Sequence, residues 1–447
     1  MTSLKTAKIH GALFFAAAAL TVATPALAQE EAKGALTVEA VWTGDIIGPV
    51  SGGLEQKAEL LDNIDIIADL DLGKAIGWNG ATLHGYLLSN NGGIPNDNAG
   101  TLQGIDNIEV ARQGARLYEL WLEAPLGDRT SVRAGLYDLN SEFYANDSAG
   151  LLINPSFGIG SELAATGPNG PSIFPSTAIA VRLNHVWDGG YVRGAVLNAH
   201  AGVPGDPDGV DLEFEDGALV IAEAGLTGNL RLSVGVWRYS DDQNDIRDVT
   251  PGGDPVRRTA QGIYVSGERV LAGDETSTQA TGFFRAGVSD GDTSPFKGGW
   301  QAGVLVERVL KDRPDSAFSI GVQQAYLSSK MRANMIGGGI DASKAETGFE
   351  VTWSDRLNER ITLQPDLQVI LDPGGESGAD PVLVPGLQVT VELFWPPRRP
   401  RGPTSPCKGP RPAAVGRGSV FRSGRSGRGR RRSRPVPAGA ARRSSPG

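Results

Sequence analysis

The sequence predicts an all-β protein, a transmembrane antiparallel β-barrel of about sixteen strands with short periplasmic turns and long external loops. Three observations lead to this prediction. Apolar and polar residues alternate with a period of two in about sixteen segments. The connections that follow even-numbered segments are short, and most of those that follow odd-numbered segments are long. The chain begins with an export signal. The alternation gives each strand one apolar face for lipid and one wet face for the lumen.

The first 28 residues are predicted to be a secretory signal peptide. Lys5 and Lys8 precede the apolar run GALFFAAAALTVA, and the small-residue site Ala26-Leu27-Ala28 follows it. The run is short for a membrane anchor, and no other stretch approaches the roughly 18 apolar residues that a helical span needs. We therefore expect cleavage before Gln29 and an exported barrel over residues 29–395.

The alternating segments occupy most of residues 35–395. They cover residues 35–42, 57–72, 80–89, 115–124, 130–137, 177–185, 191–199, 217–226, 230–239, 261–271, 277–287, 299–309, 317–325, 346–353, 360–370 and 382–395. Short connections, such as PLGDR and TGN, follow the even-numbered segments except the last, whereas most connections after odd-numbered segments are long. A soluble β-sandwich also has alternating strands, but nothing in that fold makes the connections after odd-numbered strands longer than those after even-numbered strands.

The register of each segment predicts which side chains face lipid. In 230–237 the residues predicted to face outward are Leu230, Leu232, Val234 and Val236, and those predicted to face inward are Arg231, Ser233 and Trp237. In 116–123 the same rule places Tyr118 with Leu120 and Leu122, opposite Glu119, Trp121 and Glu123. A charged side chain facing lipid near the bilayer centre would cost on the order of 2–4 kcal/mol, so the charged positions are expected in the lumen.

Composition argues against an enzyme or a metalloprotein. The only cysteine, Cys407, lies outside the predicted barrel, so disulfides and cysteine-based metal sites are excluded from the barrel. Only His84, His185 and His200 remain after signal removal, and no nucleophile, base and orienting group can be recognised together. The acidic segment DDQNDIRD (241–248) lacks the spacing of a calcium loop and is interpreted as a solvated external loop. We expect no catalytic residue, no metal and no cofactor.

The C-terminal segment differs sharply from the rest of the chain. Residues 396–447 contain fourteen Arg and one Lys but no Asp or Glu, whereas residues 1–395 carry a formal charge of about -24. This Arg, Pro and Gly-rich tail has little to bury and is predicted to be disordered. Because it begins directly after the terminal aromatic residue Trp395, we interpret it as a possible frameshift rather than a nucleic-acid-binding arm.

Several segments resemble the carbohydrate-selective outer-membrane porins of the OprB type. These segments are DNIDIIADLDL (62–72), RLYELWLE (116–123), LYDLNSEF (136–143), FPSTAIAVRL (174–183) and, most specifically, ITLQPDLQVILDPGG (361–375). The resemblance implies a sixteen-stranded barrel in the outer membrane that passes mono- or oligosaccharides through a narrowed pore. It also implies contact with outer-membrane lipid, recognition by the barrel-assembly machinery, and a monomeric or homo-oligomeric state.

The third external loop, residues 138–176, is expected to fold into the lumen and narrow it, as loops in this position do in porins generally. Sugars need hydrogen-bonding groups for their hydroxyls and flat aromatic rings for their CH faces. The residues predicted to line the pore or constriction are Glu119, Trp121, Arg133, Asn140, Glu142, Phe143, Tyr144, Arg285, Gln364, Asp366 and Gln368. Each could instead be a plain lumen-facing group; Arg133 and Glu119 could pair, and Trp121 could pack under the loop.

A general or differently selective porin, and an exported non-transport β-protein, remain alternative interpretations.

Overall fold

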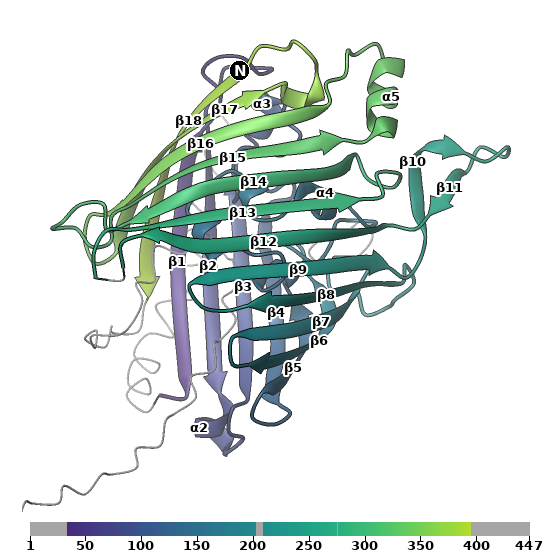
Figure 1. Cartoon of the computed structure of the whole chain (residues 1–447). Coiled ribbons are helices and arrows are strands. Elements are labelled where there is room, and N and C mark those ends of the chain that lie inside the picture. Colours follow the sequence, from purple (N-terminus) through teal and green to yellow (C-terminus); the bar gives the residue numbers. More distant parts are fainter. Residues whose placement is uncertain (1–33, 203–208, 275, 395–447) are drawn as a thin grey trace, which may run out of the picture. The chain divides into compact units, whose positions relative to one another are not determined.

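The computed structural model describes residues 34–202, 209–274 and 276–394, which form a closed antiparallel barrel (Figure 1). Sixteen of the described strands make up the barrel, and the first of them pairs with the last to close it. Closure satisfies the backbone hydrogen bonds of every strand without water, which a sheet in hydrocarbon requires. The predicted signal peptide and the Arg-rich tail lie outside the described residues.

The strands match the predicted segments. The barrel strands are β1 (Leu36–Ile47), β2 (Glu59–Asp71), β3 (Thr82–Gly92), β4 (Gly114–Pro125), β5 (Thr130–Tyr137), β6 (Ala178–Trp187), β7 (Gly190–Asn198), β8 (Ala218–Leu226), β9 (Leu230–Tyr239), β12 (Gln261–Ala272), β13 (Gln279–Ser289), β14 (Phe296–Glu307), β15 (Ala317–Leu327), β16 (Ala345–Arg356), β17 (Ile361–Leu371) and β18 (Val382–Phe394). Each predicted segment overlaps one of these strands. The largest error is at the first, which ends five residues later than expected.

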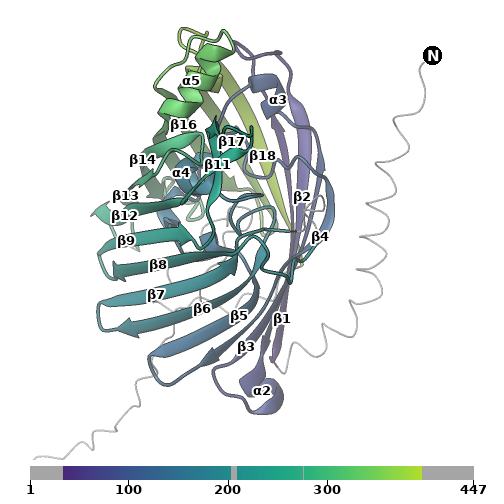
Figure 2. The ribbon, with the colours of Figure 1, turned by 90° about the vertical axis from the view of Figure 1, so that its right-hand side faces the viewer.

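The connections separate by length as predicted. Short turns join β4 to β5, β6 to β7 and β8 to β9, while residues 93–113, 138–177 and 240–260 form long connections after β3, β5 and β9. The short α-helix α2 (Leu72–Ile76) lies at the rim with the short turns, and α3 (Asn96–Ala99) and α5 (Ser329–Gly337) lie at the opposite end (Figures 1 and 2). The rim with short turns is the periplasmic one in barrels of this type. Among the described residues no helix has the length and apolar composition needed to cross a bilayer.

The faces of β9 show why the sequence alternates there. Leu232, Val234 and Val236 are exposed on the outside of the barrel, whereas Trp237 is 2% exposed. The outward residues can therefore meet lipid chains, and the inward residues pack inside the barrel. The same alternation holds in β17, where Leu367 is exposed and Gln364, Asp366 and Gln368 are buried.

The orientation of the strands predicts the surroundings of a reporter group. Spin labels at Leu232 and Leu363 should be more accessible to oxygen than to a polar nickel reagent, because both positions face hydrocarbon. A label at Ser233, the next residue of β9, is the matched control and should show the reverse preference. Aqueous surroundings at both leucine positions in lipid vesicles would contradict the transmembrane barrel.

The predicted face of Tyr118 is wrong. In the pairing of β3 with β4, Glu119 lies opposite Tyr86 and Leu117 lies opposite Leu87, so Tyr118 is an extra residue at a β-bulge. The Tyr118 side chain is 1% exposed, and its hydroxyl donates to Asp138 Oδ2 at 2.8 Å inside the barrel. Strict alternation from the sequence could not detect the inserted residue, and the bulge places two successive side chains in the lumen.

A two-stranded hairpin was not predicted in the connection after β9. Strands β10 (Gln243–Val249) and β11 (Pro255–Arg258) pair with each other outside the barrel sheet. The acidic residues predicted to be merely solvated instead contact a lysine of α5: Lys330 Nζ lies 2.9 Å from Asp248 and also pairs with Asp245. Lys330 thus links the hairpin to the helix at the external end of the barrel.

Candidate functional site: the loop that crosses the lumen

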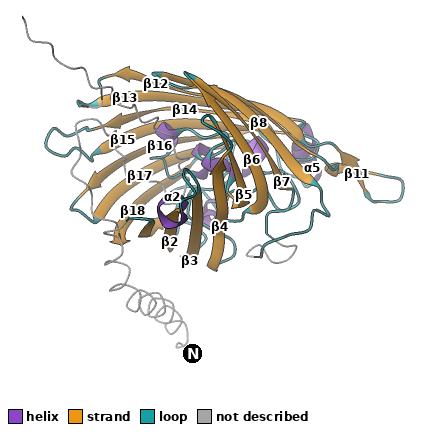
Figure 3. Ribbon diagram, turned by 90° about the horizontal axis from the view of Figure 1, so that it is seen from below, coloured by secondary structure: helices purple, strands orange, loops and turns teal. Residues whose placement is uncertain are grey.

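The connection between β5 and β6, residues 138–177, is the loop predicted to narrow the pore, and we call it loop 3. Its short helical segments lie inside the ring of strands (Figure 3). Leu139, Phe143 and Leu163 of loop 3 have no exposed surface. They belong to one buried cluster that also contains the wall residues Ala195, Leu197, Leu219, Ile221, Trp237, Tyr239 and Tyr264. Burial of this apolar surface holds the loop against the wall formed by β7, β8, β9 and β12.

Glutamates of the barrel wall accept hydrogen bonds from the backbone of loop 3. Glu223 of β8 accepts from the Tyr144 amide at 3.0 Å, and Glu268 of β12 accepts from the Ser148 amide. Glu350 of β16 accepts from two successive amides of the loop, one of them Asn154 at 3.0 Å. A carboxylate that receives backbone N–H groups makes strong charge-assisted bonds. The three glutamates therefore fix the loop at successive points across the lumen.

Glycines of the wall let loop 3 approach closely. A Cβ atom at Gly287 of β13 would lie 1.9 Å from Glu162 Oε1 of the loop. A Cβ atom at Gly321 of β15 would lie 2.6 Å from the ring of Phe157 and from Leu152. Contacts this short cannot exist, so a residue with a Cβ atom at either position would force Glu162 or Phe157 of loop 3 to shift.

The start of loop 3 carries the most highly charged contact with the wall. Arg133 Nη2 lies 2.6 Å from Glu123 Oε2, and Arg182 Nε lies 2.8 Å from Glu142 Oε2. Arg182 also reaches Glu123 at 3.2 Å, so the four side chains form one buried network of two guanidinium groups and two carboxylates. Glu142 is the only loop residue of the four. Burial alone would raise the pKa of Glu142, but Arg133, Arg182 and Arg193 outweigh it and hold that pKa at about 2.

Trp121 lies between two charged or ionisable groups. The His84 ring stacks on it with centroids 4.4 Å apart, and the Arg133 guanidinium lies 3.8 Å from its centroid. His84 and Arg133 come from β3 and β5, on opposite sides of β4, so they cover opposite faces of the indole. Glu119 accepts from the Trp121 indole and lies 3.5 Å from His84 rather than pairing with Arg133. The pair of Arg133 and Glu119 that the sequence allowed is thus replaced by the Arg133–Glu123 pair.

The structure places the remaining predicted site residues mostly behind or beneath the loops. Gln364 donates to the Leu151 carbonyl of loop 3, and Gln368 donates to the Ile105 carbonyl. Asp366 accepts from Gln368. Asn140 donates to the Phe143 carbonyl, and Tyr144 and Arg285 are buried. These side chains lie around the constriction, but they hold the loops rather than present free surface to the lumen.

The side chains that remain accessible beside loop 3 are different ones. Arg231 of β9 and Asp147 of loop 3 are more than half exposed and lie 2.7 Å apart. Arg193 of β7 is partly exposed, its guanidinium lies 4.0 Å from the Tyr191 ring, and it donates to the Glu142 carbonyl. The alternation predicted that Arg231 faces the lumen, but neither Arg193 nor Asp147 was predicted to be a site residue. Arg193 lies at an inward position of β7, so the alternation of that strand could have identified it. The position of Asp147 depends on the path of loop 3, which the alternation does not predict.

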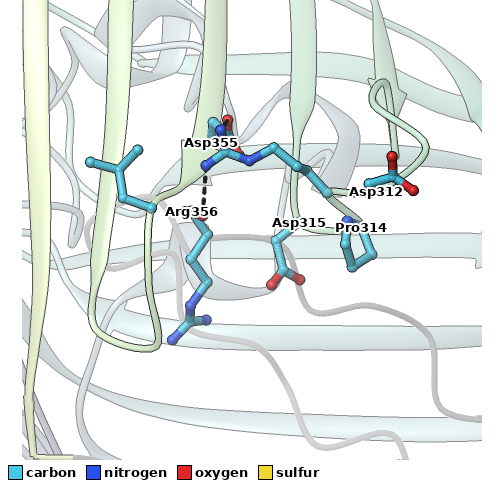
Figure 4. Close-up of a pocket in the computed structure, with 7 residues that line it drawn as sticks. Asp312, Pro314, Asp315, Asp355 and Arg356 are labelled. Atoms are coloured by element: carbon cyan, nitrogen blue, oxygen red, sulfur yellow. Dashed lines mark hydrogen bonds and ion pairs between the residues drawn. The ribbon is translucent and has the colours of Figure 1, made fainter.

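A separate hollow of about 420 Å³ lies at the periplasmic rim, between the turns that follow β14 and β16 (Figure 4). Asp312, Arg313, Pro314, Asp315, Asp355, Arg356 and Leu357 line it. Arg313 pairs with the buried Asp355 at 2.8 Å and donates to the Arg356 carbonyl at 3.2 Å. These contacts tie two neighbouring turns together at the rim, away from loop 3.

Comparisons with known proteins agree with this architecture. The family described as "Carbohydrate-selective porin, OprB family" matches residues 55–393. The chain belongs to the OprB family. The match covers all of the described barrel except β1, the last residue of β18 and the residues around them. Membership makes the chain a carbohydrate-selective porin of the outer membrane, and porins of this fold are channels rather than enzymes.

Solved structures show the same fold at low sequence identity. The high-pH structure of Pseudomonas putida OprB aligns with a TM-score of 0.72 at 19% identity, covering 83% of this chain and 96% of that one. The low-pH structure of the same protein aligns with a TM-score of 0.53 at 14% identity, covering 82% and 94%. The outer-membrane channel DcaP of Acinetobacter baumannii gives 0.50 at 11% identity, covering 80% and 97%. A search of curated protein sequences found no match.

Proposed function

We propose that this OprB-family porin lets sugars diffuse passively across the outer membrane through the part of the lumen that loop 3 leaves open. The observation that supports this most directly is the anchoring of loop 3 across the lumen by buried carboxylates of the wall. A loop held at several points narrows the lumen to a defined width, and pore width and lining groups are what select a solute. The passage needs neither a reaction nor a cofactor.

The side chains beside the opening suit a neutral, hydroxyl-rich solute. Arg193, Arg231 and Asp147 supply accessible donors and acceptors, while most of the predicted set from Glu119 to Gln368 holds the loops in place behind them. The guanidinium groups and carboxylates are largely paired with each other, so the site has little net charge to attract an ion. Several weak contacts in series would let a sugar enter and still leave. Recognition by the assembly machinery and the oligomeric state stay predictions.

Sugar-dependent block of ion current in planar bilayers tests the proposal. With purified refolded protein, mono-, di- and trisaccharides added in turn should reduce the single-channel current reversibly and in a concentration-dependent way. A sugar occupying the opening excludes the ions that carry the current, which is the physical reason for the expected block. A neutral solute of similar size without adjacent hydroxyls serves as the control and should block less.

Two other results would favour the alternatives. An ion current that no sugar reduces would contradict sugar selectivity and favour a general or differently selective porin. A folded protein that forms no channel in the bilayer would favour an exported β-protein without a transport role.

A further inference from the structure

The far side of loop 3 contains a buried polar site that the pore itself does not use. Arg285 of β13 was predicted to line the pore, but it is 1% exposed and lies behind the loop. Its guanidinium carbon lies 5.4 Å from the centroid of the Tyr144 ring, which covers it from the lumen side. The Tyr144 ring in turn stacks on Tyr264 at 3.9 Å, so Arg285 is enclosed between loop and wall.

The residues around Arg285 are close to one another by register. Arg285 lies directly opposite Gln301 in the pairing of β13 with β14, and Gly287 lies opposite Gly299 two positions along the same strands. The Glu162 carboxylate of loop 3 occupies the space above the two glycines. A Cβ atom at Gly287 would lie 1.9 Å from Glu162 Oε1, and one at Gly299 would lie 3.6 Å from Glu162 Oε2. Residues two apart on a strand share a face, so Glu162 adjoins Arg285 and Gln301.

Four buried polar atoms of this group have no hydrogen-bond partner among the described residues. They are Arg285 Nε, Arg285 Nη1, Glu162 Oε2 and Gln301 Oε1, while the other Glu162 oxygen accepts from the Tyr144 hydroxyl at 2.7 Å. Leaving a charged group without a partner in the interior is costly because its hydration is lost, so buried polar atoms are nearly always satisfied. Two of the four atoms are donors and two are acceptors, and they belong to a cation, an anion and a neutral amide.

We propose that Arg285, Glu162 and Gln301 form an internal hydration site behind loop 3, in which ordered water molecules join the guanidinium of the wall to the carboxylate of the loop. Water can donate to the two acceptors and accept from the two donors, as buried water in polar cavities does. An anion could satisfy only the donors and would be repelled by Glu162. Arg285 is therefore a positioning residue, which fixes the distance of loop 3 from the wall without touching a solute.

A high-resolution structure of the full chain tests the site directly. We expect at least one ordered water within hydrogen-bond distance of both Arg285 and Glu162, and no anomalous signal there after a bromide soak. A halide at the site, or a direct contact of the two side chains with no water between them, would overturn the proposal. This measurement does not depend on sugar transport. The hydration site can therefore be absent in a porin that transports sugars, and it can be present in a porin that does not.

A double-mutant cycle tests the link between the two charges. A spin label at Pro168, an exposed loop 3 position close to α4 (Ser161–Ala164), reports the mobility of the loop. Arg285→Met and Glu162→Gln should each mobilise the label, and the double variant should mobilise it no further than either single variant, because both remove the same connection. Effects that simply add, or an unchanged label in both variants, would contradict the proposal.

Controls separate this link from general loosening of the barrel. Arg129→Met, which removes an arginine exposed at the periplasmic rim, should leave the label unchanged. Arg285→Lys keeps the charge and should mobilise the label less than Arg285→Met. If Arg285→Met does not fold, the structure of the unmodified chain still decides whether water bridges the pair.

Discussion

Replacing Arg182 with Met should destabilise the folded barrel by on the order of 3–5 kcal/mol, the cost of leaving buried charges without their partner. Arg182 is 1% exposed and contacts Glu142 of loop 3 as well as Glu123 of the wall. Without it, Arg133 is left as the main partner of two buried carboxylates. Unfolding by urea or guanidinium in lipid vesicles, followed by tryptophan fluorescence, gives the difference in free energy.

Arg129→Met is the matched control for Arg182→Met. Arg129 also pairs with a carboxylate, Asp188, but at 3.4 Å and with both side chains more than half exposed. An exposed pair of this kind contributes about 0–1 kcal/mol, because water screens the charges. Equal loss of stability in the two variants would show that the buried network does not hold the barrel and loop together.

Removing loop 3 should increase the single-channel conductance several-fold and abolish block by sugars. Tyr137 and Ala178 are directly opposite each other at the ends of β5 and β6, so a short turn can replace residues 139–176 without moving the strands. The change removes the segment that crosses the lumen and leaves the closed sheet intact. Conductance in planar bilayers measures the effect, and heat-dependent migration on a gel confirms that the variant is folded.

The hairpin of β10 and β11 provides the control for loop removal. It is another long external insertion, but its strands form a sheet only with each other, outside the barrel sheet, and its side chains contact α5 rather than the lumen. Replacing residues 242–258 with a short turn should leave the conductance and the sugar block close to those of the unmodified chain. Unchanged conductance after removal of loop 3 would mean that this loop does not set the width of the path.

The sequence predicted the barrel better than it predicted the site. Glu123 and Arg133 lie at inward positions of their strands, as period-two alternation predicted. Arg182 also lies inward but was not predicted as a site residue. The alternation did not show that Arg133 pairs with Glu123 rather than Glu119, because that choice depends on the register of β4 against β5, in which Arg133 lies opposite Glu123. Arg285 illustrates the same limit: its inward register was correct, but whether it faces solute or the back of a loop depends on where loop 3 lies.

Strand number, strand direction, most of the lipid-facing side chains and the division into short and long connections follow from the sequence alone, because the bilayer requires alternating faces and a closed sheet. The constriction follows from the tertiary structure. Its contacts join residues far apart in the chain, as Asn154 joins Glu350 and Gln364 joins Leu151. Closing the barrel brings such residues together, and no local pattern records which loop atom will meet which wall carboxylate.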